Sequence, residues 1–317
     1  MPTEGGFPRI LVLRGGAIGD FIVTLPVFQA LRRAWPRAYI EVVGYPHIAQ
    51  LALACGLVNA VTSMNKAEMA RLFSLKPSIP EEQARYLRSF GLILSYLYDP
   101  GNTVRENLLG VGVRQVVYGS PQVGGMPAVS HMLKPLESLA IYPEEPEYPR
   151  LDLDDDTRAR GRERLKRLGE RVVAIHPGSG SPKKNWPLDR FLSAGRAVRA
   201  NTGASVCLIL GDADDAIAGE LKRGTGEFPV VTGCSLVDLA GILAACDGYL
   251  GNDSGITHMA AAVGIPTVAL FGPTDPAIWG PRAERVAILT PASERVGDLA
   301  EIPVDAVLRA LQAMMPF

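Results

Sequence analysis

Gly-Asn-Asp-Ser-Gly-Ile-Thr-His, residues 251–258, is the stretch that decides the fold of this 317-residue chain. The apolar run before it, residues 246–250, predicts a short buried strand, and residues 256–263 after it predict a helix. Either Asp253 or Ser254 is expected to cap that helix. A strand, a tight turn and a helix in this order bring free backbone N–H groups and the positive end of a helix dipole to one point, which is a seat for phosphate.

Two further residues of this stretch support an anion site. Gly255 removes a side chain where a ligand has to come close, and His258 lies one helical turn farther on, where it offers a donor or a positive charge. A histidine at such a position is also compatible with a hydrogen-bonded core residue. Its distance from the turn favours contact with phosphate.

A second glycine-rich loop follows the predicted strand at residues 172–175. It reads His-Pro-Gly-Ser-Gly-Ser-Pro-Lys-Lys-Asn-Trp-Pro, residues 176–187. In this loop Ser179 and Gly180 are candidates for hydrogen bonds to phosphate, and Lys184 is a candidate point charge. The alternative for the lysine is an ordinary solvated surface residue.

The chain opens with a third unit of the same kind. Residues 9–14 predict a strand, and Gly-Gly-Ala-Ile-Gly-Asp, residues 15–20, predicts a glycine loop before a helix. This loop lacks the Gly-x-Gly-x-x-Gly pattern, which argues against a nicotinamide-dependent oxidoreductase. Asp20 is either a helix cap or a residue that takes part in chemistry.

Together these segments resemble glycosyltransferase family 9, the lipopolysaccharide heptosyltransferases. The resemblance is carried by Gly-Asp at 19–20, Lys-Asn-Trp-Pro at 184–187, Asp-Ser-Gly-Ile-Thr-His at 253–258 and Phe-Gly-Pro-Thr-Asp-Pro at 271–276. Four motifs in the family's order make a chance match an improbable explanation.

The resemblance implies roles for individual residues. It makes Asp20 the catalytic base, places Lys184 on the donor diphosphate and assigns Asp215 to the nucleoside. It also assigns Cys234 and Leu236 to the adenine pocket. The full set of donor-binding residues that we expect is Ser179, Gly180, Lys184, Asp215, Cys234, Leu236, Asp253, Ser254, Gly255 and His258.

The length of the chain indicates two domains. Strand-like and helix-like runs alternate, halt at the proline-rich acidic stretch 142–149 and resume, which predicts an N-terminal acceptor-side domain at 1–158 and a C-terminal donor domain at 159–317. Each half fits a doubly wound, Rossmann-like α/β sheet. Two such halves facing across a cleft are the GT-B architecture that the resemblance also implies. The last helix, about 304–315, is expected to pack back on the first domain.

Bulk properties restrict the cellular setting. A net charge of −1 argues against a nucleic-acid partner. We find neither an apolar run of the ~20 residues that a membrane span needs nor a signal-peptide pattern, so a cytoplasmic enzyme is expected, with peripheral contact at the inner membrane face left open. The four cysteines show no metal spacing and fit buried thiols.

The predicted reaction is inverting transfer of a sugar, heptose from ADP-heptose, to a lipopolysaccharide-core or related glycan. No Asp-x-Asp is placed as a clear metal clamp, because Asp212, Asp214 and Asp215 lie in a turn that we assign to the nucleoside. We therefore expect neither a metal nor another cofactor, and positive charge from the protein is expected to stabilise the leaving diphosphate. Three alternatives stay open: a transferase that uses a UDP- or GDP-sugar, an epimerase on the same fold, and a non-catalytic nucleotide-binding protein.

Overall fold

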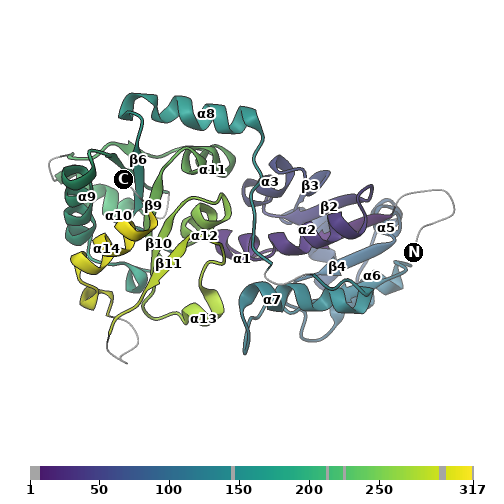
Figure 1. Cartoon of the computed structure of the whole chain (residues 1–317). Helices are drawn as coiled ribbons and strands as arrows, with labels where there is room; N and C mark the ends of the chain where they lie inside the picture. Colours follow the sequence, from purple (N-terminus) through teal and green to yellow (C-terminus); the bar gives the residue numbers. More distant parts are fainter. Residues whose placement is uncertain (1–7, 144–146, 212–213, 224–225, 293–297, 316–317) are drawn as a thin grey trace. The chain divides into compact units, whose positions relative to one another are not determined.

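The computed structural model of the protein describes residues 8–143, 147–211, 214–223, 226–292 and 298–315. The chain forms two compact units, Met1–Glu147 and Tyr148–Phe317 (Figure 1). Each unit is a parallel sheet with helices on both faces, which is the doubly wound α/β fold predicted for each half.

The sheet of the first unit has five strands in the order β3-β2-β1-β4-β5, all parallel. This order puts β1 at the centre, and its residues Ile10 to Leu13 are fully buried. The strands are β1 (Arg9–Leu13), β2 (Tyr39–Gly44), β3 (Ala60–Ser63), β4 (Leu92–Ser95) and β5 (Val116–Tyr118).

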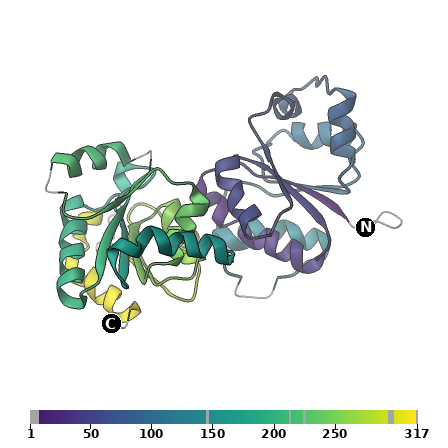
Figure 2. The same cartoon turned by 90° about the horizontal axis from the view of Figure 1, so that it is seen from above.

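Helices cover both faces of this sheet, and Figure 2 shows one group (purple) and another (blue) on opposite sides of it. On one face, side chains from α4 to α6 pack with Leu11, Leu13 and Ile93 in a single apolar cluster. The helices are α1 (Ile18–Ile22), α2 (Leu25–Ala34), α3 (Pro46–Ala54), α4 (Ala67–Ala70), α5 (Glu81–Arg88), α6 (Thr103–Gly110) and α7 (Ala128–Leu133), with 3-10 turns η1 (Arg71–Phe73) and η2 (Lys134–Leu139).

The sheet of the second unit has six parallel strands in the order β11-β10-β9-β6-β7-β8. The strand predicted at 246–250 begins two residues later, because Cys246 closes the turn after the preceding helix by donating its N–H to Leu243 O. The strands are β6 (Val172–His176), β7 (Ser205–Ile209), β8 (Val230–Val231), β9 (Gly248–Asn252), β10 (Thr267–Leu270) and β11 (Val286–Leu289).

The helices of this unit also cover both faces of its sheet (Figure 1). They are α8 (Asp155–Leu165), α9 (Leu188–Thr202), α10 (Asp215–Arg223), α11 (Leu236–Ala244), α12 (Gly255–Ala262), α13 (Pro276–Trp279) and α14 (Val304–Met314), with 3-10 turns η3 (Lys166–Leu168), η4 (Pro182–Lys184) and η6 (Leu299–Glu301). Within the described part of the chain, no helix is both long and apolar enough to cross a bilayer.

The division between the units falls before residue 158, the predicted end of the first domain. The connecting chain already belongs to the second unit, because Leu151 donates its N–H to Ala262 O at 2.9 Å. Helix α8 then packs on α11 so closely that a Cβ on Gly161 would lie 1.9 Å from Gly241 O.

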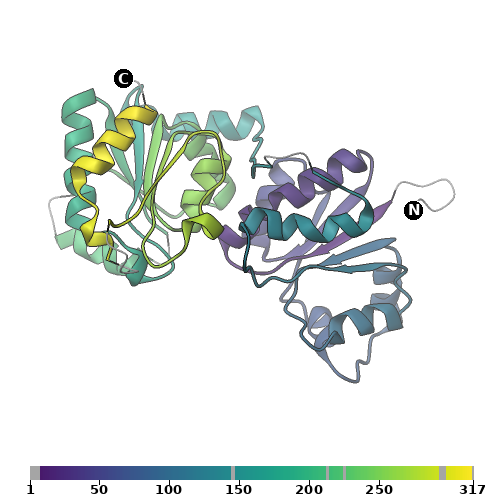
Figure 3. The same cartoon turned by 60° about the horizontal axis from the view of Figure 1, so that its bottom comes forward.

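The last helix packs on the sheet of its own unit. Figure 3 shows α14 (yellow) along the sheet of its own unit. It contacts α9 and the strands β9 to β11, and its residues Val307 and Leu311 belong to the apolar core of the second unit. These apolar side chains of α14 are therefore buried within the second unit.

Candidate active site

Asn252 joins the two loops of the second unit that were predicted to bind the donor. Strands β6 and β9 are neighbours, and their carboxyl ends bring residues 177–187 next to the turn before α12. The fully buried Asn252 accepts a hydrogen bond from Trp186 N at 2.9 Å and donates one to Pro177 O at 2.8 Å. Sequence reasoning gave Asn252 no role, although a polar residue at the end of an apolar strand was a usable signal.

The predicted phosphate-binding lysine is paired with a carboxylate. Lys184 Nζ donates to Asp253 Oδ2 at 2.6 Å, and the side chains are 32% and 9% exposed, respectively. The structure therefore brings these two predicted residues together. An anion that binds here has to compete with Asp253 for the ammonium group or share it.

Ser254 is the cap of α12, one of the two residues predicted for that position. Its Oγ accepts a hydrogen bond from Thr257 N at 3.3 Å, and Gly255 is the first helical residue. The first N–H groups of a helix have no partner within the helix, so this turn presents donors at the positive end of the dipole. His258 is buried, and its N–H donates to Ser254 O at 3.2 Å.

The hydroxyl of Ser179 is engaged within its own loop. It lies 2.7 Å from Ser181 O and 2.6 Å from Asn185 Oδ1, both hydrogen-bond acceptors, and it accepts from Ser181 N at 3.2 Å. In the structure the hydroxyl of Ser179 therefore stabilises the conformation of its own loop. Gly180 differs, because nothing lies within 4 Å of the position that its Cβ would occupy. The space beside Gly180 can admit a ligand.

The acidic turn after β7 contains a buried carboxylate that sequence reasoning did not separate from its neighbours. Asp214 accepts a hydrogen bond from Gly211 N at 2.7 Å and is 4% exposed. A Cβ on Gly178 would lie 1.7 Å from Asp214 Oδ1, so only glycine fits there. The next residue, Asp215, is exposed at the start of α10 and borders a cavity of about 860 Å³ between α9 and α10.

His176, the last residue of β6, is held by a hydrogen bond to the neighbouring strand β7. Its Nδ1 lies 2.9 Å from Ile209 O and 3.9 Å from Asp214 Oδ2. Burial lowers the pKa of His176, because a charged imidazole would lose its hydration, and this effect outweighs the hydrogen bond to Ile209 and the charge of Asp214. A neutral ring that donates from Nδ1 to the carbonyl fits this environment.

Cys234 and Leu236 lie at the start of α11. Ser235 caps this helix by accepting a hydrogen bond from Asp238 N at 3.1 Å. Cys234 is half-buried, and burial raises the pKa of its thiol. Strand β8 precedes this segment and pairs with β7, whose end leads to Asp215. The topology thus places both residues on the β7 side of the sheet.

Asp20 lies in the first unit, within the short helix α1. Its Oδ2 accepts a hydrogen bond from Ala17 N at 2.9 Å, so the residue does act as a helix cap. Its side chain is 32% exposed, so part of it remains accessible. The cap contact and a role in chemistry are therefore compatible.

Arg14 begins the loop between β1 and α1, and the sequence analysis did not identify it as a candidate residue. It follows β1, is 3% exposed and donates from Nη2 to Asp20 O at 2.8 Å and from Nε to Thr24 Oγ1 at 2.9 Å. Its Nη2 also lies 3.7 Å from the carboxylate of Asp20. The signal in the sequence was a charged residue at the end of a buried strand.

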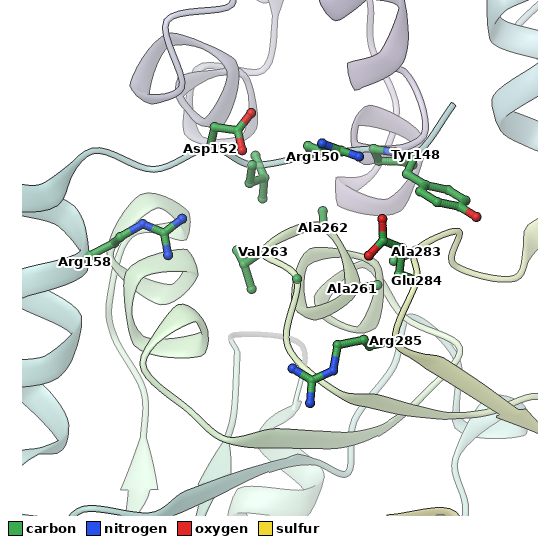
Figure 4. Close-up of a pocket in the computed structure, with 13 residues that line it drawn as sticks. Tyr148, Arg150, Asp152, Arg158, Ala261, Ala262, Val263, Ala283, Glu284 and Arg285 are labelled. Atoms are coloured by element: carbon green, nitrogen blue, oxygen red, sulfur yellow. The ribbon is translucent and has the colours of Figure 1, made fainter. Parts of the chain in front are cut away.

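A pocket elsewhere in the second unit contains none of the predicted residues. Figure 4 shows its 13 lining residues, among them Arg150, Arg158 and Arg285. It lies beside Val263, after the end of α12, and Glu284, just before β11. That is the amino end of the strands, whereas ligands of such sheets bind at the carboxyl ends.

Among the residues that the structure describes, no three His, Cys, Asp or Glu side chains are grouped so that they could hold a metal ion. Asp212, a member of the acidic turn, lies outside the described residues.

Known proteins resemble this chain in sequence and in fold. The sequence profile described as Glycosyltransferase family 9 (heptosyltransferase) matches residues 118–299, more than half of the chain. Lipopolysaccharide heptosyltransferase 2 of Escherichia coli is 26% identical over 325 residues, 92% of each protein. Lipooligosaccharide heptosyltransferase 2 of Haemophilus influenzae is 28% identical over 130 residues, which are 38% of this chain and 37% of that protein. This match therefore spans little more than a third of the relative's length. The solved structure of Escherichia coli ADP-heptose lipopolysaccharide heptosyltransferase II superposes with a TM-score of 0.77 at 20% identity, over 96% of this chain and 98% of that one. This likeness concerns the fold, which is the GT-B fold.

Proposed function

The chain belongs to glycosyltransferase family 9, the heptosyltransferases, and from that premise we propose that it transfers heptose from ADP-heptose to a lipopolysaccharide-core or related glycan. The first unit takes the acceptor and the second unit takes the donor. The transfer inverts the anomeric centre and uses no metal. We also propose that the reaction takes place in the cytoplasm.

One observation carries this proposal: the ion pair between Lys184 and Asp253 at the carboxyl end of β6 and β9. It places a cation within reach of the Ser254-capped start of α12, where helix N–H groups point outward. A diphosphate matches this arrangement, because it is anionic before and after the transfer. The name of the Escherichia coli relative, an ADP-heptose transferase, supports the choice of donor.

The proposed mechanism is a direct displacement. The exposed part of the Asp20 carboxylate accepts the proton of the acceptor hydroxyl as that oxygen attacks the anomeric carbon. The bond from the anomeric carbon to the diphosphate oxygen breaks, and ADP leaves with the electron pair. Lys184, His258 and the start of α12 stabilise the charge that develops on ADP. Asp215, Cys234 and Leu236 hold the nucleoside.

The first experiment tests the donor. Thermal shift measurements with ADP, UDP and GDP at equal concentration should give the largest rise in Tm with ADP. A ligand that binds only the folded protein stabilises it, and at equal concentration the nucleotide with the highest affinity stabilises it most. A larger shift with UDP or GDP would indicate a different nucleotide-sugar.

The second experiment separates binding from chemistry. Asp20→Asn should keep the Kd for ADP within a few-fold and lose ~100-fold or more of the transfer rate, because an amide cannot accept the proton. Wild-type turnover by this variant would reduce Asp20 to its cap contact with Ala17.

Activity that disappears with EDTA and returns with a divalent ion would contradict the metal-free mechanism.

A further inference from the structure

The carboxyl edge of the first sheet carries aromatic side chains on both sides of the Asp20 loop. Strands β2 and β4 flank β1 in the sheet. The three strands end at one level, because Arg14 N donates to Val43 O and Tyr96 N donates to Leu13 O, both at 2.9 Å. The segments that follow them therefore start beside one another, with the Asp20 loop in the middle.

Tyr98, after β4, is the more exposed of these aromatic residues. It is 59% exposed, whereas Tyr96, two residues earlier, is 1% exposed. The ring of Tyr96 packs so closely on Gly119 that a Cβ on this glycine would lie 2.4 Å from it, and its hydroxyl donates to Met132 O at 2.5 Å. Tyr98 thus projects from a firmly anchored base.

The rest of this loop is fixed as well. The buried Asp99 accepts a hydrogen bond from Arg105 N at 3.1 Å, and its carbonyl accepts one from Asn102 N at 3.1 Å. Asn102 adopts a left-handed conformation with φ 57°, which lets the chain turn into α6. A loop held in this way loses little conformational freedom when a ligand binds to it.

Tyr45 and His47 occupy the other side of the Asp20 loop, directly after β2. Tyr45 precedes the first residue of α3, and its ring centroid lies 6.2 Å from that of the exposed His47, with 33° between the ring planes. Helix α3 contacts α1, the helix that contains Asp20 (Figure 1). This aromatic pair therefore belongs to the neighbourhood of the proposed base.

We infer that Tyr98 on one side and Tyr45 with His47 on the other form the subsite for the acceptor sugar, a role that rests on the proposed function. Rings of this kind present a flat apolar face to the C–H face of a pyranose, while tyrosine hydroxyl and imidazole nitrogen bond to sugar hydroxyls. Sites for small polar ligands commonly combine such rings with a few polar groups. A sugar held between the two sides has a hydroxyl to offer to Asp20.

The test uses the full-length protein, ADP-heptose and a core oligosaccharide that is freed of acyl chains and lacks the heptose to be added. Tyr98→Ala should raise the KM for the oligosaccharide about tenfold, and Tyr45→Ala ~3- to 10-fold, which is the range of a lost aromatic contact. The Kd for ADP and the kcat at saturating oligosaccharide should stay within about threefold of the wild type, because the substitutions leave the donor unit untouched. Tyr98→Phe, which retains the ring and loses only the hydroxyl, should raise the KM less than Tyr98→Ala does.

Tyr142→Ala is the matched control, because Tyr142 is also a tyrosine of the first unit and is 72% exposed. It should leave the KM for the oligosaccharide unchanged. Unchanged KM values in both Tyr98→Ala and Tyr45→Ala would overturn the subsite, as would a Tyr142→Ala effect of the same size.

Failure of the proposed function would look different. In that case the wild type neither binds ADP nor releases it from ADP-heptose, and saturation-transfer NMR with the oligosaccharide alone decides the subsite. A signal with the wild type that is lost in Tyr98→Ala would support the subsite. Equal signals, or none with the wild type, would overturn it.

Discussion

Replacing Asp253 with asparagine should strengthen the binding of ADP. Asp253 holds the ammonium group of Lys184 at 2.6 Å, and asparagine keeps the shape of the side chain while it removes the negative charge. In the wild type, a phosphate group has to displace or share this carboxylate. In Asp253→Asn the ammonium group is available to the ligand from the outset.

The magnitude follows from the burial of the pair. Two unit charges 4 Å apart attract by ~4 kcal/mol at an effective dielectric constant near 20, while fully exposed pairs contribute ~0.2–1 kcal/mol. Asp253 is 9% exposed and Lys184 32%, so this pair lies between the two cases. We expect a gain of ~1–1.4 kcal/mol, or a Kd for ADP that falls ~5- to 10-fold.

Titration calorimetry with ADP measures this effect. Lys184→Ala should weaken ADP binding, and in its background Asp253→Asn should gain less than it does in the wild type, because only the direct repulsion between carboxylate and phosphate is left to remove. Transfer by Asp253→Asn need not follow ADP affinity, since Asp253 is also expected to contact the donor. Weaker ADP binding by Asp253→Asn, or equal gains in both backgrounds, would refute the competition between carboxylate and phosphate.

Further substitutions test other parts of the two units. Arg14→Met should lower the free energy of unfolding in urea by ~1–3 kcal/mol, because it removes the donor to the carbonyl of Asp20. It should leave the Kd for ADP unchanged. A variant as stable as the wild type would contradict the role of this buried guanidinium. The pKa of His176 is lowered in the folded protein, so the unfolded chain binds more protons near pH 6. The free energy of unfolding should therefore fall as the pH drops below ~6.5, by at most ~1.4 kcal/mol per pH unit from this residue. In His176→Gln the plot of Tm against pH should be flatter over this range, and an equally steep plot would argue against the contribution of His176. Gly161→Ala should lower the free energy of unfolding by ~1–3 kcal/mol, because its Cβ would meet Gly241 O. The control Gly219→Ala, whose Cβ would have nothing within 4 Å, should be neutral or stabilising by ~0.5–1 kcal/mol. Equal Tm values for the two variants would count against close packing of α8 on α11.

The sequence predicted those parts of the fold that depend on local pattern. The strands expected at 9–14 and 172–175 are β1 (Arg9–Leu13) and β6 (Val172–His176), each within one residue of the expected end, because each is an apolar run that the sheet buries. Ser254 was one of two expected caps and is the one observed, since the preference for serine at a helix start is also local. A helix was also expected at about 304–315, where α14 lies, but a helical pattern does not specify which surface will bury the helix.

Tertiary pairing could not be derived in the same way. Lys184 and Asp253 were each predicted to face the donor, yet they are 69 positions apart and no spacing rule connects them. The same holds for Asn252 and Trp186, 66 positions apart, whose hydrogen bond forms only because β6 and β9 are neighbours in the sheet. The strand order would have been needed to recognise either pair.

The glycines of the candidate site show why the same residue type can have two meanings. Gly178 and Gly180 lie in one loop, and of the two only Gly180 was predicted to bind the donor. In the structure the carboxylate of Asp214 occupies the space beside Gly178, whereas the space beside Gly180 is open. An alanine at 178 therefore has to expel a buried side chain from the acidic turn, and it would disturb the fold before it disturbed a ligand. An alanine at 180 meets no protein atom, so any loss of ADP binding that it causes reports contact with the donor itself.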